Sequence, residues 1–508
     1  MFGTKSEKTG IARKSGLDIA RGLSDTLFMP KKKTTHKLSR RQFASTTAKS
    51  AAAAFAFQFI PSRAWGQLTK PTLAGIGAGG KGSADTSGAS RAGFQVTALV
   101  DVVDASKLQS SAGRRYQSMI RVRENFPKAK FFTDYREMFD KLGDKVDAVT
   151  ISTPDHHHFH AAAAAMQSGK HVYCQKPLTH GIWEARMMAQ MARQSGVKTQ
   201  MGNQAHANDH MRRCVELIRS GIIGKVKEVH AWTNRPIWPQ GFQKAPAKEA
   251  VPEWLDWEQW IGPAPWHDYS AQIAPFAWRG WWDFGTGALG DMACHIMDMP
   301  YWALKPGAPK SVRAEQQGAT DLSPPINSKI TWDFGQSEHT AEDGFRFHWY
   351  DGYLDAHFDR DRWQLVKNSQ EYNHPDNDVL EGLSFKEFGS IVVGEKGKLF
   401  FNRSRNNWVV KPSSHLDGFQ WPAQSVPRAS RQDNYQEWMD AVNGAIPACQ
   451  SNFIHAGPFT EQILLGVLAQ RVPDTTLEWD APSMSIKGRP ELKKYIQRPY
   501  RKGWEMVV

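Results

Sequence analysis

Short apolar runs alternate with amphipathic patterns between residues 72 and 201. Apolar and β-branched content predicts strands at residues 72–76, 95–100, 146–152, 171–175 and 197–201. The spacing of apolar positions predicts helices at residues 134–142, 158–168 and 183–195. Strands that alternate with helices are typical of a doubly wound parallel sheet, so this region predicts an α/β domain.

The pattern changes after about residue 205. A predicted helix at residues 211–220 leads into a strand at 226–233, and a late helix is predicted at 462–471. Further strand-like segments, joined by polar or glycine turns, are residues 329–334, 390–393, 397–401 and 408–411. This order predicts a C-terminal α+β domain with a mainly antiparallel open sheet.

The positive charge of the chain is concentrated at its N-terminus. The 508 residues carry a net +13, but residues 1–66 hold 13 Lys or Arg and three acids, a net +10. The remainder carries only +3 and no nucleic-acid-binding motif, so no nucleic-acid partner is expected. Arg40 and Arg41 precede an apolar stretch at 44–60, and Ala64-Trp65-Gly66 follows with small residues. This pattern predicts a twin-arginine signal and export of the folded protein to the periplasm or beyond.

No apolar run in the chain has the length of a membrane span; the longest, residues 51–60, is interrupted by Gln58 and lies inside the leader. The mature chain is therefore predicted to contain no transmembrane helix. A chance Arg-Arg pair in a disordered basic tail is the alternative interpretation of the leader.

A glycine-rich loop follows the first predicted strand. Gly77, Gly79 and Gly82 form G-x-G-x-x-G between a strand and a helix, the arrangement that cradles a dinucleotide pyrophosphate. Asp101 lies 19 residues beyond Gly82 at the end of the second strand, where an acid binds the adenosine ribose. Because this acid repels a 2′-phosphate, NAD is predicted rather than NADP. A second frame through Gly75, Gly77 and Gly80 also fits, but it places the turn inside the strand.

These features divide the chain into four predicted parts. They are a leader (residues 1–66), a dinucleotide-binding Rossmann domain (67–204), an α+β substrate and oligomerisation domain (205–480) and a C-terminal tail (481–508).

Three motifs downstream of the glycine loop resemble those of the glucose–fructose oxidoreductase/inositol dehydrogenase family (Gfo/Idh/MocA). They are Thr153-Pro154-Asp155-His156-His157-His158, Gln175-Lys176-Pro177 and Asp291-Met292-Ala293-Cys294-His295. The resemblance implies that Thr153, Pro154, His158, Gln175 and Lys176 contact the cofactor, and that Pro177 takes the cis form. It also implies that Lys176, Asp291 and His295 are catalytic. Gln175 stands where the family has Glu, which removes a charge beside the nicotinamide.

The spacing of the last motif suits the implied chemistry, because residues four apart share one helical face. Histidine titrates near neutral pH and is suited to accepting a hydroxyl proton. The four histidines His156, His157, His158 and His160 are adjacent rather than at metal-ligand spacing, and no matching Cys or acid group follows them. No metal site is therefore predicted.

Aromatic residues are concentrated after the first domain. Ten of the 20 tryptophans lie between Trp232 and Trp302, and flat aromatic faces suit sugar rings, although aromatics also dominate cores and interfaces. Candidate substrate residues are Asn203, Gln204, His206, Trp238, Arg279, Trp281 and Trp282.

Three functions remain open from the sequence. The first is an NAD(P)-dependent oxidoreductase that acts on a sugar or polyol hydroxyl; since free NAD is scarce outside the cytoplasm, its cofactor would be tightly bound. The second is an NAD-dependent, redox-neutral glycoside hydrolase. The third is a non-catalytic sugar-binding protein. The resemblance implies a homo-oligomer, either a dimer or a tetramer.

Overall fold

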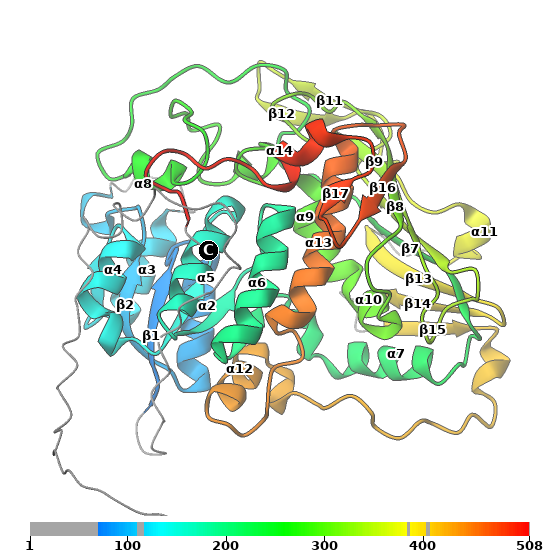
Figure 1. Ribbon diagram of the computed structural model, residues 1–508. Helices are drawn as coiled ribbons and strands as arrows, with labels where there is room; N and C mark the ends of the chain where they lie inside the picture. The colour runs from blue at the N-terminus through cyan, green and yellow to red at the C-terminus, as the bar shows by residue number, and fades with distance from the viewer. Residues whose placement is uncertain (1–69, 109–115, 384–386, 403–406, 507–508) are drawn as a thin grey trace, which may run out of the picture. The chain divides into compact units, whose positions relative to one another are not determined.

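The computed structural model describes residues 70–108, 116–383, 387–402 and 407–506 (Figure 1). The predicted leader at residues 1–66 lies outside the described residues. Within the described ranges no helix is both long and apolar enough to cross a membrane.

The first domain is built on a six-stranded parallel sheet in the order β3-β2-β1-β4-β5-β6. Its strands are β1 (Thr72–Ile76), β2 (Gln95–Val100), β3 (Lys130–Phe132), β4 (Ala148–Ile151), β5 (His171–Cys174) and β6 (Thr199–Met201). Its helices are α2 (Lys81–Ala92), α3 (Gln117–Asn125), α4 (Tyr135–Leu142), α5 (His158–Gln167) and α6 (Ile182–Ser195). The strand order reverses between β1 and β4, and ligands bind such sheets at the crevice beyond that switch point.

Local sequence explains why these elements begin and end where they do. Asp134 caps α4 by accepting a hydrogen bond from the Arg136 backbone N–H, and Tyr135, Met138 and Leu142 form the buried face of that helix. Gly196 ends α6 in the left-handed conformation, with φ of 68°. All four residues of β4 are buried, as expected for a strand covered on both faces.

The second domain is built on a nine-stranded sheet in the order β15-β14-β13-β7-β10-β9-β8-β16-β17. Its strands are β7 (Val226–Thr233), β8 (Ser311–Gln317), β9 (Asn327–Phe334), β10 (Phe345–Asp351), β13 (Phe388–Gly394), β14 (Lys398–Asn402), β15 (Asn407–Lys411), β16 (Leu477–Asp480) and β17 (Ser485–Ile486). Neighbouring strands are antiparallel except β7 and β10, which are parallel. The predicted combination of a Rossmann domain and a mainly antiparallel sheet is therefore confirmed.

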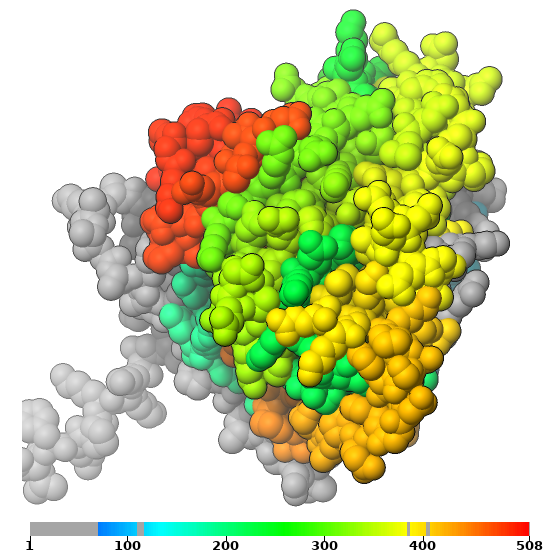
Figure 2. Space-filling view, turned by 90° about the vertical axis from the view of Figure 1, so that its right-hand side faces the viewer, coloured from blue at the N-terminus to red at the C-terminus, as the bar shows by residue number. Residues whose placement is uncertain are grey.

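Helices cover one face of the larger sheet. They are α7 (Asp209–Arg219), α9 (Gly287–Ile296), α10 (Asp298–Leu304) and α13 (Phe453–Gln470). Helices α6 and α13 pack against each other between the two sheets, so one continuous apolar core joins the two domains (Figure 1). Figure 2 shows a face formed mainly by the segments after about residue 205, coloured green to orange.

The remaining short elements lie at the edges of these layers. They are α8 (Trp257–Ile261), β11 (Ala356–Asp359), β12 (Gln364–Lys367), α11 (Asn377–Leu380), α12 (Asn434–Val442) and α14 (Lys493–Ile496). Helix α12 lies within the predicted substrate domain, but it packs on the Rossmann domain, where Trp438 stacks on Phe94 at 4.4 Å. The predicted tail contains β17 and α14, and its Trp504 is buried.

Candidate active site

The glycine loop lies between the end of β1 and the start of α2. Gly77 has φ of +71°, and a Cβ there would lie 2.7 Å from the Thr153 backbone nitrogen. A Cβ at Gly82 would lie 1.8 Å from the carbonyl oxygen of Gly77. Glycine is therefore required at both ends of the loop, by backbone conformation at one and by close packing of helix against strand at the other.

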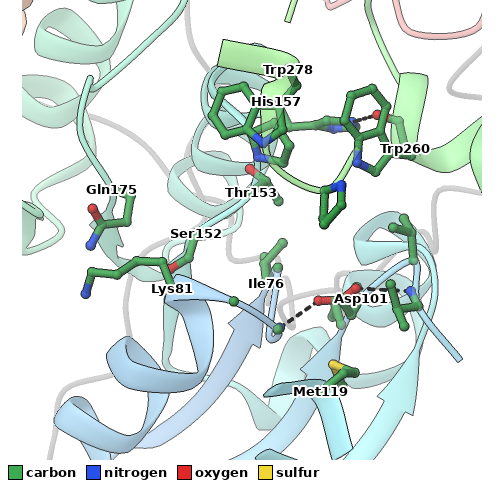
Figure 3. A pocket seen from close by; sticks show the side chains of 18 of the residues that line it. Ile76, Lys81, Asp101, Met119, Ser152, Thr153, His157, Gln175, Trp260 and Trp278 are labelled. Carbon is green, nitrogen blue, oxygen red and sulfur yellow. Dashed lines mark hydrogen bonds between the residues drawn. The ribbon is translucent and has the colours of Figure 1, made fainter. Parts of the chain in front are cut away.

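Asp101 lies at the end of β2 and is tied to this loop. Its carboxylate accepts hydrogen bonds from the Gly79 N–H at 2.7 Å and from the Val103 N–H at 3.0 Å (Figure 3). Burial raises the pKa of Asp101, and the backbone N–H groups oppose that rise. The side chain is therefore fixed beside the loop, where a carboxylate has lone pairs left for ribose hydroxyls.

A cleft with a volume of about 780 Å³ runs from Asp101 past the glycine loop to the second domain. This volume falls within the usual range for ligand and cofactor pockets. Its lining includes these residues predicted from the sequence: Gly77, Gly79, Asp101, Thr153, Pro154, Gln175, Lys176, Gln204, Arg279 and His295. Most of the predicted nucleotide and catalytic residues therefore line one continuous cavity, whereas Gly82, His158 and Asp291 are not among its lining residues.

Gln175 is held by a buried carboxylate that the sequence analysis did not single out. Its Nε2 donates to Asp85 at 2.9 Å, and the Ser152 hydroxyl donates to the same oxygen at 2.7 Å. Lys81 and the Tyr435 hydroxyl donate to the other oxygen, the latter at 2.6 Å. Figure 3 shows Lys81, Ser152 and Gln175 gathered on one side of the cleft.

Since Asp85 is fully buried, a Glu in place of Gln175 would set two carboxylates against each other. The Gln at position 175, where the family has Glu, therefore suits its neighbour Asp85, because an amide can donate a hydrogen bond to that carboxylate. No local pattern in the sequence signals this pairing, because the two residues lie 90 positions apart.

Lys176 and Asp291 form an ion pair at the far end of the cleft. The Lys176 Nζ donates to Asp291 Oδ1 at 2.7 Å and to the Asp291 main-chain oxygen at 2.9 Å. Arg279 Nε lies 3.4 Å from the same carboxylate oxygen. Burial pushes the pKa of Asp291 upward, but Lys176 and Arg279 outweigh it and hold that pKa below its usual value. Asp291 is therefore a carboxylate at neutral pH.

Helix α9 carries both Asp291 and His295, one turn apart, and His295 lines the cleft. The peptide bond between Lys176 and Pro177 is cis, as the resemblance implied. Lys176 and His295 therefore line the cavity together with Arg279, and Asp291 is held beside them by its contacts with Lys176 and Arg279.

Asp155 is a further acid at this end of the cleft, and no sequence pattern predicted a role for it. It accepts a hydrogen bond from the Thr286 hydroxyl at 2.9 Å and is buried. Burial raises the pKa of Asp155 to about 7, against the opposing effect of Arg279, Lys176 and the Thr286 hydrogen bond. A carboxyl group that titrates near neutrality can exchange protons at working pH.

The structure places several other candidates outside the cleft. Trp281 and Trp282 are buried, and the indole of Trp282 donates to the Thr320 carbonyl. His206 is buried against Asp298 at 2.9 Å and stacks on Trp302, whereas its neighbour Gln204 lines the cleft. The aromatic side chains that do line the cleft are Tyr116, Tyr135, Trp260, Phe276, Trp278 and Trp504.

The remaining candidates hold the framework behind the cleft. Asn203 donates to Asp298 at 2.7 Å, and the Trp238 indole donates to Gln240 at 2.7 Å. His158 bridges the carbonyl oxygens of Pro177 and Thr153, at 2.8 and 2.9 Å. His158 therefore braces the two cleft-lining motifs against each other from behind.

Comparison with known proteins agrees with this geometry. Residues 72–203 match the family model described as the oxidoreductase family with an NAD-binding Rossmann fold. Residues 208–335 match the model of the family's C-terminal alpha/beta domain. Together the two matches span just over half of the chain, so the protein belongs to the Gfo/Idh/MocA oxidoreductase family, as its motifs suggested.

Individual relatives match over part of the chain. An uncharacterized oxidoreductase of Streptococcus pneumoniae is 31% identical over 91 residues, which are 18% of this chain and 25% of that protein. The levoglucosan dehydrogenase of Pseudarthrobacter phenanthrenivorans is 25% identical over 167 residues, 33% of this chain and 35% of the relative. The chain therefore matches only about a quarter to a third of the length of these relatives.

Solved structures share the fold over most of the chain. The WlbA dehydrogenase from Chromobacterium violaceum, in complex with NADH and UDP-GlcNAcA, gives a TM-score of 0.53 at 14% identity and covers 83% of this chain and 99% of its own. An NAD-binding oxidoreductase from Klebsiella pneumoniae gives 0.50 at 20% identity, with 81% and 99% covered. At these identities the likeness establishes the fold alone.

Proposed function

We propose that this protein is an NAD-dependent oxidoreductase that acts on a hydroxyl group of a sugar or polyol and keeps its cofactor tightly bound. The observation that carries the proposal is the position of Lys176, Asp291 and His295 at one end of a cleft whose other end holds the glycine loop and Asp101. Of the two relatives described above, the one with the longer match is a levoglucosan dehydrogenase. This relative supports a carbohydrate-type substrate.

The residues present fit NAD. Gly77, Gly79 and Gly80 line the cleft at the N-terminus of α2, where backbone N–H groups can bind a pyrophosphate, and glycine at positions 77 and 82 permits the close backbone packing of the loop. Asp101 would bind the adenosine ribose and disfavour a 2′-phosphate. When bound, NAD would supply the hydride acceptor that the protein's own side chains lack.

The side chains at the other end supply binding and proton transfer. Lys176 is held in place by Asp291 and would donate a hydrogen bond to the substrate oxygen as negative charge develops there. His295, one helical turn from Asp291, would accept the hydroxyl proton. Arg279 and Gln204 line the same part of the cleft and would orient the remaining hydroxyl groups of the substrate.

The leader supports a location outside the cytoplasm. We propose that the twin-arginine sequence exports the folded protein to the periplasm or beyond with its cofactor already bound, because free NAD is scarce there. Such a captive cofactor must be regenerated in place, by a second substrate for instance. A homo-oligomer, either a dimer or a tetramer, is the proposed assembly.

The decisive experiment begins with protein purified through export. Acid release and quantification of nucleotide should give close to one NAD per chain, and free sugars or polyols added without further NAD should convert it to NADH. Cleavage of aryl glycosides with no net NADH would instead favour the redox-neutral hydrolase. A protein that neither retains nor binds NAD(H) would contradict the proposal and leave the sugar-binding alternative.

A further inference from the structure

The C-terminal segment crosses from the larger sheet to the mouth of the cofactor cleft. Figure 1 shows it in red, running from α14 towards α8. We call residues 498–504 the C-terminal strap. It was predicted as part of a tail, yet its Trp504 is only 6% exposed and lines the cleft.

The strap is tied to the Rossmann domain at several points. Arg498 and Tyr500 both donate to the buried carboxylate of Glu184 in α6, at 3.1 and 2.9 Å. Arg498 also donates to the His156 carbonyl oxygen at 2.8 Å, and His160 Nε2 donates to the Trp504 carbonyl oxygen at 3.0 Å. These contacts fix the strap to the Rossmann domain beside α5 and α6.

The same strap also binds the segment around α8, in the part of the chain that follows the Rossmann domain. The Arg501 guanidinium donates to the Gly262 carbonyl oxygen at 2.8 Å and to Glu258 at 2.9 Å, and the Arg501 N–H donates to the Pro263 carbonyl oxygen at 3.0 Å. The α8 segment is itself close-packed on the Rossmann domain, since a Cβ at Gly262 would lie 2.0 Å from the His157 ring. The strap and α8 therefore form one continuous cover.

This cover lies at the adenosine end of the cleft. The backbone of residues 254–256 pairs with residues 102–104, directly after Asp101: the Asp104 N–H donates to Trp254 and the Asp256 N–H donates to Val102. Arg136 joins the two halves of the cover, with its guanidinium 4.0 Å from the Trp504 ring and a hydrogen bond of 3.2 Å to Gln259. Gln259 and Trp504 both line the cleft.

From these contacts we infer that the C-terminal strap, together with α8, encloses the adenosine half of NAD and sets the rate at which the cofactor leaves. This inference rests on the proposed function. A nucleotide bound against Asp101 can leave this end only if the Trp504 ring or the α8 segment moves. Because such covers act on dissociation more than on association, the strap slows release and keeps the cofactor with the protein.

The experiment measures the release of NADH from the full-length protein. The protein is loaded with NADH and diluted into excess NAD, and the loss of bound-nucleotide fluorescence is recorded over time. Trp504→Ala removes the ring from the cleft wall, and we expect release at least about tenfold faster. Trp504→Phe retains an aromatic face and should restore most of the retention. Arg501→Gln cuts the tie to α8 without opening a cavity and should speed release by roughly twofold to fivefold.

Lys502→Ala is the matched control, because Lys502 is an exposed cation of the strap and does not line the cleft. Its release rate should equal that of the wild type. Equal release from the wild type, Trp504→Ala and Arg501→Gln would overturn the strap proposal while leaving the proposed function intact. Failure of the wild type to bind NADH at all would instead contradict the proposed function.

Discussion

The two ends of the cleft differ in the kind of side chain that each presents. The substrate end gathers two cations, Lys176 and Arg279, with the acids Asp291 and Asp155 and the imidazole of His295. The adenosine end has one acid, Asp101, and is closed by apolar and aromatic groups such as Leu255, Trp260 and Trp504. Groups suited to proton transfer lie at one end, and mainly apolar and aromatic packing surfaces lie at the other. Chemistry and retention of the cofactor should therefore be separable by mutation.

The largest expected effect is a loss of turnover while NAD stays bound. Lys176→Ala removes the cation expected to stabilise the developing alkoxide, so turnover should fall on the order of a thousandfold. The glycine loop and Asp101 are untouched, so bound NAD should remain close to one per chain. Lys128→Ala, at an exposed lysine of the same domain, is the control. Loss of NAD from Lys176→Ala would show that the two ends are not independent.

Replacing Asp155 tests whether a buried acid at the substrate end makes the free energy of unfolding depend on pH. Burial raises its pKa to about 7, so the folded state binds a proton more tightly than the unfolded chain does. Its contribution to stability is fully present below the unfolded-state pKa of 3.8, falls as the pH rises from there towards about 7, and is gone above that pH. Asp155→Asn cannot ionise, so above that pH the variant should gain about 2 to 4 kcal/mol in unfolding free energy relative to the wild type.

Urea denaturation on both sides of that pH measures the difference. Asp144→Asn, at an exposed acid, is the matched control and should show no such dependence. A wild-type-minus-variant difference that does not change with pH would show that the pKa of Asp155 is not raised to about 7 by folding.

Gly82→Ala tests the nucleotide-binding part of the cleft. A methyl group there would lie 1.8 Å from the Gly77 oxygen, so the loop must shift away from the pyrophosphate position. NAD affinity should fall roughly tenfold to a hundredfold, measured by calorimetric titration of nucleotide-free protein. Gly143→Ala is the control, since nothing lies within 4 Å of its Cβ position. Unchanged affinity in Gly82→Ala would place the pyrophosphate elsewhere.

The smallest expected effect concerns Gln175, which lines the cleft between its two ends. Gln175→Glu would bring a second carboxylate to within 2.9 Å of Asp85, and we expect a loss of about 1 to 2 kcal/mol in unfolding free energy at neutral pH. Adding Asp85→Asn should restore much of that loss, because an amide can donate to the new carboxylate. If the double variant is no more stable than Gln175→Glu, the pairing of these residues does not explain the glutamine.

The sequence predicted the parts of this molecule whose signal is local. The strands around the glycine loop, and the acid at the end of β2, follow from short periodic patterns and were found at their predicted positions. Helix α13 was predicted to begin at residue 462 but begins at Phe453, because Asn452 caps it and packing on α6 tolerates Pro458 near its start. Strand β3 was missed, since it has three residues and begins with an exposed lysine.

The site was predicted less completely than the fold, because several of its contacts join distant residues. Asp85 meets Tyr435 across 350 positions, and His160 meets Trp504 across 344. Neither pair has a local pattern that marks it. Likewise Trp278 and Trp281 are both buried, but only Trp278 lines the cleft, and only the folded loop distinguishes them.

The proposed reaction is the transfer of a hydride from a sugar or polyol hydroxyl to a captive NAD at the charged end of the cleft. It is tested most directly by mixing exported, NAD-loaded protein with a panel of free sugars and polyols, without added NAD, and recording NADH absorbance in a single turnover. At least one such compound should convert the bound NAD to NADH in the wild type, whereas Lys176→Ala, with NAD still bound, should not respond. Bound NAD that no sugar or polyol reduces, or equal reduction in Lys176→Ala, would contradict it.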